Sequence, residues 1–513
     1  MNHDEKPERD VEIEALKNRI KELELLLKHY EERFRLSQKR RFGASSEKSE
    51  YDQLRMDIEE LKTTLLENEE TEPDAQPVNG QPRKKRTRAE MLPVNLPVEE
   101  ILCELPEEER FCPDCGGETH VIGHECRDEL VVIPAKVMIR RYAACVYACQ
   151  ACTEEIDHTP IIKARLPKPV IKGSFASPEF VAYAAYQKFA MGVPLYRQEQ
   201  DWKRKGVHIS RQTMANWLVY GAEHWLQPLM DELKRRLLRH RTLHADETTF
   251  QVLKEPGRAP QSLSYLWCYR TSGDSEEPIV LAEYKPNRKK ENPNAFLRGF
   301  SGYLHTDGYD AYHKLPPEIV IVGCWAHVRR KWDEALNAVP KSDREGCTAL
   351  LGKRYCDTLF AIDRELVSFD ANQRHTVRLE RLKPLMDEFF SWAGGVEARP
   401  KSSLGKAISY MFSQRQYLQN VLLDGCLELS NNRAERTIKP FVISRKNFLF
   451  ANTPSGGAAA AILFSLIETA KETGVDPFEY LTYVFRTAPN TDLNALENLQ
   501  TLLPAGYKRL YCP

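Results

Sequence analysis

The sequence predicts a multidomain α+β protein, and three observations lead to that fold class. At 513 residues the chain is too long for one hydrophobic core. A heptad pattern, two paired-cysteine motifs and a segment in which strands alternate with helices follow one another along the chain. We therefore expect an N-terminal coiled coil, a zinc-binding β domain, a helical domain of the helix-turn-helix type, and an α/β domain with a helical insertion.

Apolar residues recur at steps of three and four near the N-terminus, at Ile13, Leu16, Ile20, Leu23, Leu27, Tyr30 and Phe34. This seam predicts a leucine-zipper-like coiled coil over residues 10–66, through which the chain forms a homodimer or higher oligomer. The alternative is an amphipathic helix folded against its own domain. Residues 67–95 carry Pro, Gly and blocks of charge with few large apolar side chains, which predicts a disordered linker.

Two CxxC motifs, Cys112 with Cys115 and Cys149 with Cys152, flank a strand-like segment within residues 96–165. Four thiolates at about 2.3 Å form a tetrahedral zinc site. The motifs therefore predict one structural Zn²⁺. A redox-active pair is the alternative. Other residues in the segment remain possible ligands: Cys103, Cys126, Cys145, His120 and His124.

The charge of the chain is balanced overall but uneven along its length. Lys and Arg total 73 against 74 Asp and Glu, whereas residues 163–241 hold 15 Lys or Arg against 6 Asp or Glu. This local excess favours a polyanionic partner, as expected for DNA binding. The N-terminus lacks a hydrophobic region and the longest apolar run is too short for a bilayer, so we expect no membrane partner and a cytoplasmic location. Thirteen cysteines, an odd number, favour reduced thiols.

Three helices are predicted within residues 170–239: one from about 177, one at about 194–204, and one capped by Ser210. The short turn "KGVHIS" between the last two is typical of a helix-turn-helix, whose second helix presents its first polar residues to base edges. The candidate DNA-contacting residues of this helix pair are Arg197, Lys203, Arg204, Lys205, Arg211 and Gln212.

An α/β domain is predicted over residues 240–475. Three candidate strands, "TLHADETTFQVL", "SLSYLWCYRTS" and "PIVLAEYKP", are followed by a fourth that ends at Asp307. This order is typical of a ribonuclease-H-like sheet, which begins with an antiparallel meander. The first and fourth strands are neighbours in that fold, so Asp246 and Asp307 should share one edge. A helical insertion is expected at about 326–428, and a C-terminal helix and tail at 476–513.

The stretch "ELSNNRAERTIKP", residues 428–440, predicts the start of a helix with Glu435 among cations. A solvated helix with ordinary ion pairs is the alternative. If the helix packs beside the strands, Glu435 completes a cluster of three acids that divalent cations would neutralise. Two Mg²⁺ or Mn²⁺ ions about 3.5 to 4 Å apart would then serve phosphodiester chemistry. Asn431 and Asn432 would cap the helix or hold metal-bound water. The candidate phosphate contacts are Arg433, Arg436, Lys439, Arg445 and Lys446.

The order of these motifs resembles that of bacterial transposases of the insertion-sequence sixty-six family. The resemblance runs from about residue 10 to 486 and includes the CxxC pairs, "LHADET", "HTDGYDAY", "GCWAHVRRKW", "NNRAERTIKPFVISRKNFLF" and "ETGVDPFEYL". It implies a DDE transposase in which Asp246, Asp307 and Glu435 are the metal ligands. It also implies an element that encodes accessory small proteins.

Cys324 and His327, spaced CxxH, resemble a motif found in the corresponding region of several DDE families. We expect a structural role for them rather than a catalytic one. A zinc site there lacks two further evident ligands.

The function expected from the resemblance is cleavage at the 3′ ends of a mobile element and joining of those ends to target DNA, by a protein associated with the nucleoid. Two alternatives stay open. One is a catalytically inactive, zinc-containing DNA-binding protein, and the other is a structure-specific nuclease with the same metal chemistry.

Overall fold

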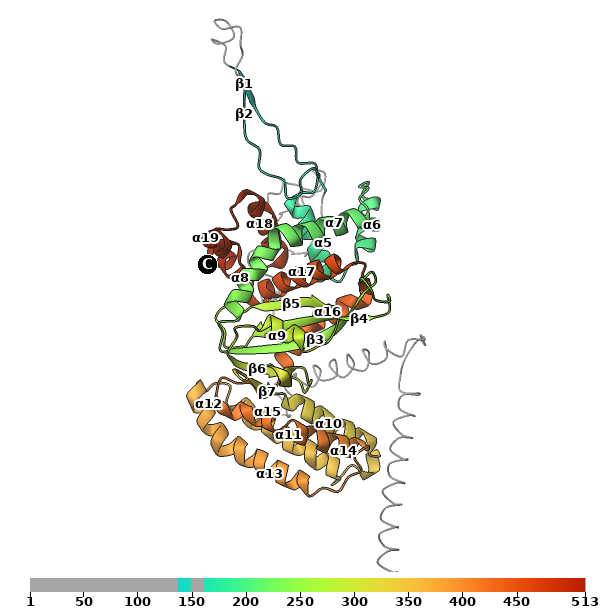
Figure 1. Ribbon diagram of the computed structural model, residues 1–513, viewed down its shortest axis with the longest axis vertical. Helices are drawn as coiled ribbons and strands as arrows, with labels where there is room; N and C mark the ends of the chain where they lie inside the picture. The colour runs from blue at the N-terminus through green and yellow to red at the C-terminus, as the bar shows by residue number, and fades with distance from the viewer. Residues whose placement is uncertain (1–136, 149–160, 513) are drawn as a thin grey trace, which may run out of the picture. The chain divides into compact units, whose positions relative to one another are not determined.

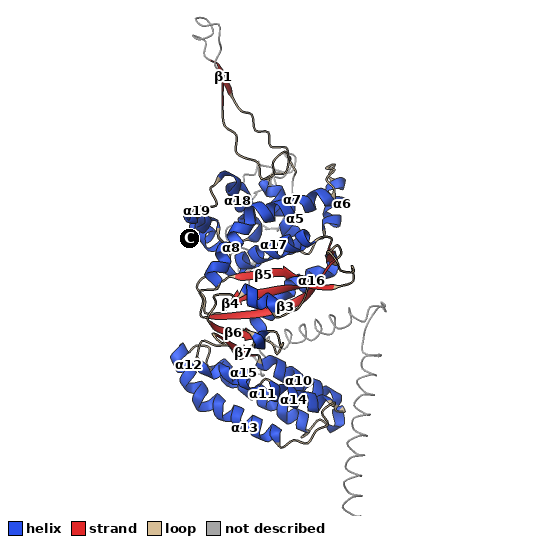
Figure 2. Ribbon diagram, viewed as in Figure 1, coloured by secondary structure: helices blue, strands red, loops and turns tan. Residues whose placement is uncertain are grey.

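The computed structural model describes residues 137–148 and 161–512 of the chain. Every element named below belongs to a single compact unit. Helices surround a mixed β-sheet in this unit (Figures 1 and 2). The predicted coiled coil, the linker and the four zinc-site cysteines lie outside the described residues.

The sheet has six strands, in the order β5-β4-β3-β6-β7, with β8 paired to the end of β3. Strands β3, β4 and β5 form an antiparallel meander, whereas β6 and β7 run parallel to β3. The prediction that the first and fourth strands are neighbours is confirmed. The strands are β3 (Thr242–Val252), β4 (Leu263–Thr271), β5 (Val280–Lys285), β6 (Gly302–Thr306), β7 (Ile319–Gly323) and β8 (Phe450–Ala451). A separate antiparallel pair consists of β1 (Val146–Ala148) and β2 (Ile161–Lys163).

The helices before and within the first half of the sheet include the three that the sequence predicts. Ser177 caps the first and Ser210 the third, each accepting a backbone N–H with its hydroxyl, at 3.1 Å. A π-helical turn, Ala222–Leu226, joins α7 to α8. These helices are α5 (Pro178–Phe189), α6 (Leu195–Arg204), α7 (Arg211–Gly221), α8 (Gln227–Leu237) and α9 (Glu291–Phe296).

Helices α5 to α8 and the sheet share one hydrophobic core, so they form one compact body. Helix α17 (Pro454–Thr473) lies between them and is buried along most of its length. It also covers the edge strand β5: Ser465 accepts the N–H of Ala282 at 2.7 Å and Thr469 accepts that of Val280 at 3.0 Å. Pairing these donors closes an edge that would otherwise be open. This helix therefore supports the core, and Gly474 ends it in the left-handed conformation, with φ of 79°.

The chain between β7 and residue 424 is almost entirely helical, close to the predicted insertion. Its core is aromatic, with Trp325, Trp332, Phe389 and Phe390 buried against one another. The insertion packs along β7, the last strand of the sheet (Figure 1). Its helices are α10 (Trp325–Ala338), α11 (Thr348–Glu365), α12 (Ala371–Val377), α13 (Lys383–Gly394), α14 (Ser403–Ser413) and α15 (Arg415–Gln419).

The C-terminal region is more structured than expected. Beyond α18 (Pro477–Thr487), which Asp476 caps, we expected a tail. The segment instead forms α19 (Leu496–Leu502) and α20 (Pro504–Tyr511). Tyr507 packs on the Tyr480 ring, with ring centroids 5.9 Å apart, and this burial of aromatic surface explains why the segment folds. No described helix is both long and apolar enough to cross a membrane.

Gly352 allows α11 to pack closely on α10. A Cβ at this position would overlap the ring of Trp332, which is fully buried. We expect Gly352→Ala to destabilise the insertion by about 1 to 3 kcal/mol, since a packed core has no room for the added methyl group. Urea denaturation followed by tryptophan fluorescence would measure this. The matched control is Gly394→Ala, whose Cβ would lie 3.6 Å from Phe412, an ordinary contact. Equal stability of the two variants would contradict the packing argument.

Candidate active site

Two strands bring the first two predicted acids together. Asp246 lies within β3, and Asp307 directly follows β6. The parallel register pairs His244 with His305. Asp246 and Asp307 each follow two positions later, so they point to the same face as these histidines and lie beside each other. The ligand atoms of Asp246 and Asp307 lie within 4.8 Å of each other. Asp246 and Asp307 therefore lie together, as the sequence predicts.

A repeated motif, Leu-His-x-Asp, underlies this arrangement, and the sequence analysis missed it. It occurs at residues 243–246 and again at 304–307. The rings of His244 and His305 stack with centroids 4.3 Å apart, and both side chains are fully buried. Burial and the neighbouring His244 lower the pKa of His305 well below its usual value. The acids are thus supported by a closely packed pair of rings on the same face of the two strands.

Glu247 is a further acid at this edge that the sequence analysis did not select. Its ligand atom lies within 4.8 Å of those of Asp246 and Asp307, and its side chain is only 1% exposed. The Tyr312 hydroxyl donates to it at 2.5 Å, and Arg288 forms an ion pair with it. Burial and the charge of Asp307 raise the pKa of Glu247 to about 7. Sequence alternation misses this residue, because neighbours on a strand point to opposite faces.

The acids within β3 and directly after β6 repel one another. Burial and then the charges of Glu247, Asp307 and Glu435 raise the pKa of Asp246 well above its usual value. Several hard oxygen donors held close together, with their charges poorly neutralised, suit a divalent cation such as Mg²⁺ or Mn²⁺. The residues present therefore fit the predicted metal ions.

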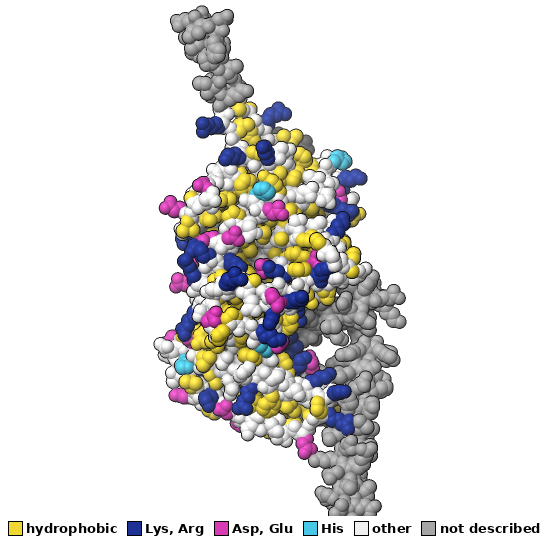
Figure 3. All heavy atoms as spheres, viewed as in Figure 1, with side chains coloured by type: hydrophobic (Ala, Val, Ile, Leu, Met, Phe, Trp, Pro, Cys, Tyr) yellow, Lys and Arg dark blue, Asp and Glu magenta, His cyan; other side chains and the backbone are white. Residues whose placement is uncertain are grey.

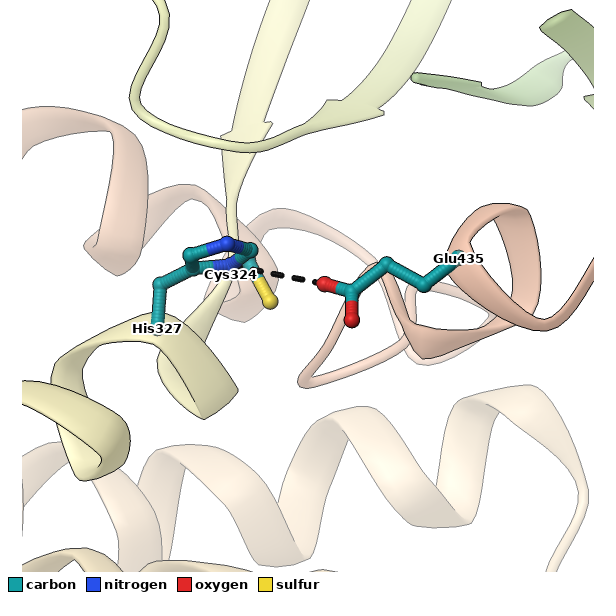
Figure 4. A group of neighbouring side chains, drawn as sticks. All are labelled: Cys324, His327 and Glu435. Atoms are coloured by element: carbon teal, nitrogen blue, oxygen red, sulfur yellow. Dashed lines mark ion pairs between the residues drawn. The ribbon is translucent and has the colours of Figure 1, made fainter. Parts of the chain in front are cut away.

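Glu435 lies on the first turn of α16 (Asn432–Phe448), which packs against β3. Its carboxylate points toward the insertion (Figure 4), where its ligand atom lies within 4.8 Å of those of Cys324 and His327. His327 Nδ1 is 3.6 Å from one carboxylate oxygen, and Arg330 Nη2 is 3.4 Å from the other. Glu435 is also close enough to Asp246 to influence its pKa. Its carboxylate thus faces His327 and Arg330 of α10.

Cys324 and His327 gain a third potential metal donor in the structure. The sequence suggested a structural role because further ligands were missing, and Glu435 reaches them from a distant helix. Cys324 is buried, which together with the charge of Glu435 raises the pKa of its thiol to about 12. Its sulfur also accepts the backbone N–H of Asn431 at 3.1 Å.

Asn431 has a different role from the one expected. It occupies the position before α16, but its side chain makes no capping hydrogen bond. Instead, its Oδ1 lies 3.0 Å from Nδ1 of His244, and its Nδ2 donates to the carbonyl of Ala245 at 2.9 Å. The capping prediction is wrong for Asn431, because the strand offers its buried side chain stronger partners. Asn432 is the first residue of the helix.

The cations of α16 differ in how accessible they are. Arg436 and Lys446 are exposed and Lys439 is half-buried. Arg433 pairs with Glu428 at 2.7 Å. Arg445 donates to the backbone and hydroxyl of Thr249 and so joins the helix to β3. The structure therefore gives Arg445 an internal partner in place of the DNA phosphate that we expected.

Glu428, which lies just before α16, is a second acid that could be compared with Glu435 as a metal ligand. Burial acts to raise its pKa, but the hydrogen bond with His244 and the charges of His244 and Arg433 outweigh it and lower the pKa well below its usual value. Its Oε1 also accepts the N–H of Gly273 at 3.3 Å. With its carboxylate already bound to these partners, Glu428 is less suited to a metal ion than Glu435.

The two helices predicted to form a helix-turn-helix are α6 and α7. Arg211 and Gln212 are exposed on the first turn of α7; the guanidinium of Arg211 lies 5.5 Å from the centre of the Tyr196 ring. The amide of Gln212 donates to Asn216 at 2.9 Å. Lys205 forms an ion pair with Asp201 at 2.7 Å. The remaining candidates, also exposed, are Arg197, Lys203 and Arg204. On the face drawn in Figure 3, Lys and Arg side chains are interspersed with Asp and Glu.

Four segments of the chain match models of known protein families. Residues 173–459, which span helices α5 to α8, the sheet and the insertion, match a family model described as "Transposase IS66 family". Three further models match other segments: "Transposase C of IS166 homeodomain" at residues 29–101, "zinc-finger binding domain of transposase IS66" at 109–153, and "IS66 C-terminal element" at 465–504. The chain is thus a transposase-type protein that processes nucleic acid, and DNA is its partner.

Two similar proteins come from Sinorhizobium fredii (strain NBRC 101917 / NGR234). Uncharacterized protein y4qI is 32% identical over 405 residues, which are 75% of this chain and 72% of y4qI. Uncharacterized protein y4jD is 29% identical over 474 residues, 89% of each chain. Since a family model covers more than half of the chain and y4qI is similar over most of its length, the chain belongs to the IS66 transposase family.

The raised pKa of Glu247 gives the metal-free protein a distinctive pH dependence. A carboxyl group whose pKa rises from 4.5 to about 7 on folding binds more protons when folded between these values, so stability falls as the pH rises through this window. We expect the free energy of unfolding in EDTA to fall by about 1 to 2 kcal/mol from pH 5 to 7.5. For a protein of this size, this lowers the melting temperature by a few °C.

Addition of Mn²⁺ should restore more of the melting temperature at pH 7.5 than at pH 5, because the ion neutralises the acids only when they are deprotonated. Glu247→Gln is the control and should flatten the dependence in EDTA. A melting temperature that rises from pH 5 to 7.5 in the wild type would contradict the raised pKa.

Proposed function

We propose that this chain is a DDE transposase that binds the ends of its insertion sequence, cleaves DNA there and transfers the ends to target DNA. The observation that supports this most directly is the meeting of Asp246 and Asp307 on neighbouring parallel strands. Glu435 on α16 is near enough to Asp246 to raise its pKa. The strand order, with an antiparallel meander followed by two parallel strands, supports a ribonuclease-H-like catalytic domain.

Asp246, Asp307 and Glu435 would hold two Mg²⁺ or Mn²⁺ ions, and Glu247 is near enough to assist. Such ions activate the attacking oxygen and stabilise the leaving oxygen of a phosphodiester. The protein contributes the positions of the acids: β3 and β6 fix the two aspartates, and Asn431 ties the start of α16 to the backbone beside Asp246. The exposed Arg436 and Lys446 would contact phosphates near the cleaved bond.

The remaining parts of the chain would support this activity. One structural Zn²⁺ would be held by Cys112, Cys115, Cys149 and Cys152, and the match of residues 109–153 to a zinc-finger model favours this. Residues 10–66 would associate as a coiled coil into a dimer or higher oligomer. The helix pair α6–α7 would read the element ends. Accessory proteins of the same element and a place on the nucleoid belong to the same proposal.

An oligonucleotide assay with the element's own ends distinguishes this proposal from its two alternatives. A transposase binds, cleaves and joins. A nuclease with the same metal chemistry cleaves without joining, whereas an inactive DNA-binding protein only binds.

Removal of any one metal-binding acid should abolish cleavage. We expect Asp246→Asn, Asp307→Asn and Glu435→Gln each to lower cleavage by orders of magnitude while DNA binding stays near wild type, because each change removes a charge and preserves shape. Residues that act as one unit lose function together, so a double variant should be little worse than a single one. Gel-based cleavage with Mg²⁺ would measure this.

The matched control for these variants is Glu334→Gln, which removes a carboxylate that pairs with Lys331 on the surface of α10. It should cleave normally, because an exposed ion pair contributes about 0 to 1 kcal/mol. Near-normal cleavage by Glu435→Gln would show that this acid is not a metal ligand.

The first turn of α7 should determine recognition of the element ends. We expect the double variant Arg211→Ala with Gln212→Ala to lose about 1 to 3 kcal/mol of binding for each good base contact, with a smaller effect on random DNA. Fluorescence anisotropy with both DNAs would measure this. Arg239→Ala is the control, since Arg239 is exposed in the same basic segment but lies beyond α8. If the double variant weakens binding to both DNAs equally, Arg211 and Gln212 contact phosphates and do not read bases.

A further inference from the structure

The acid on α16 is held by a cation that the proposed chemistry does not use. Arg330 lies one turn after His327 on α10, and its Nη2 is 3.4 Å from Oε2 of Glu435. Its Nη1 is also 3.4 Å from Nε2 of His327. The side chains of Arg330 and Glu435 are each only 16% exposed. The insertion therefore places a largely buried guanidinium against a predicted metal ligand.

A second group from the insertion reaches the same place. Tyr410, on α14, approaches the backbone after Asp307 so closely that a Cβ on Gly308 would lie 2.8 Å from its hydroxyl oxygen. The Tyr410 hydroxyl is thus a hydrogen-bond donor beside the backbone that follows Asp307.

The contact between Arg330 and Glu435 cannot persist unchanged once Glu435 binds a divalent cation. A carboxylate shared with a metal ion attracts the guanidinium less, and the ion repels it. A guanidinium that faces a metal-bound carboxylate is well placed to donate to a second anion at the same site. The substrate supplies one at this position, the phosphate to be cleaved, and guanidinium geometry suits phosphate oxygens.

We propose that Arg330 is a catalytic residue that exchanges Glu435 for a non-bridging oxygen of the scissile phosphate, and that Tyr410 donates a second hydrogen bond to the same group. The inference rests on the proposed function. It assigns the insertion a direct part in catalysis: the β-sheet edge holds the metal-binding acids, and the insertion supplies the donors that face them across the phosphate.

If Arg330 exchanges partners in this way, Arg330→Gln should raise the affinity for Mn²⁺ and lower the rate of cleavage. In the protein without DNA, Arg330 competes with cations for Glu435, so Arg330→Gln should bind Mn²⁺ several-fold more tightly than wild type. In the presence of the element end, the same variant should cleave about 10²- to 10³-fold more slowly, as expected when one donor to a developing negative charge is lost. A residue that only supports the fold would weaken both.

Arg329→Gln is the matched control. Arg329 is the preceding residue of the same helix and also pairs with a carboxylate, that of Asp357 on α11, at 2.5 Å. This variant should leave Mn²⁺ affinity and cleavage unchanged. For the tyrosine, Tyr410→Phe should slow cleavage about tenfold without altering Mn²⁺ affinity. Its control is Tyr355→Phe, which removes a hydroxyl bonded to Glu388 elsewhere in the insertion.

The experiment uses the full chain and three measurements: Mn²⁺ binding followed by electron paramagnetic resonance, cleavage of the element end, and binding of an end in which a neutral methylphosphonate replaces the scissile phosphate. Wild type should bind the methylphosphonate end more weakly than the natural end, whereas Arg330→Gln should not distinguish them. Arg330→Lys should still bind the natural end somewhat more tightly than the methylphosphonate end. Lysine keeps the positive charge but cannot donate the two parallel hydrogen bonds of a guanidinium.

Two results would overturn the inference: weaker Mn²⁺ binding by Arg330→Gln together with a lower melting temperature, or undiminished discrimination against the methylphosphonate end. Failure of the proposed function is a separate result. If wild type binds Mn²⁺ and the element end but does not cleave it, the proposed function fails, and the Mn²⁺ and methylphosphonate comparisons still decide the role of Arg330.

Discussion

The parallel pairing of β3 with β6 is the constraint on which the rest of the site depends. It sets His244 beside His305, and through the two-residue repeat of a strand it sets Asp246 beside Asp307. The hydrogen bonds of the ladder and the stacked rings below it hold the two carboxylates together against their repulsion. Every other group at the site is arranged around these two charges.

Charge at this site is balanced by contacts that come from several directions. Arg288 pairs with Glu247 from the segment after β5, and Arg330 pairs with Glu435 from the insertion. Arg433 of α16 pairs with Glu428, which lies just before that helix. Asp246 has a raised pKa despite these cations, so the balance is incomplete. A site that remains short of positive charge keeps an affinity for cations, and its own arginines limit that affinity.

Local patterns were sufficient to predict much of the fold. The strand around Asp246, the helix capped by Ser210, and the stop at Gly474 all follow from alternation, capping and the left-handed preference of glycine. The same alternation, with the known order of strands in one fold, was enough to bring Asp246 and Asp307 together. These features depend on residues close in sequence or on a simple topological rule.

The contacts that could not be predicted join distant parts of the chain. Asn431 is an ordinary capping residue by sequence, and only the packed structure shows that β3 occupies its side chain. Arg330 and Tyr410 lie in an insertion whose helices pack in a way that no local pattern specifies. Glu247 was missed for a different reason: the rule of alternating faces does not account for the length of its side chain.

The insertion also affects when the site can exist during synthesis. Asp246 and Asp307 leave the ribosome with β3 to β6, whereas Glu435 follows only after the entire insertion. At about 5 to 20 residues per second, the third acid emerges several seconds after the second. A nascent or truncated chain that ends before α16 therefore has strands without a complete set of acids. The order of the sequence itself delays the complete set of acids until most of the chain has been made.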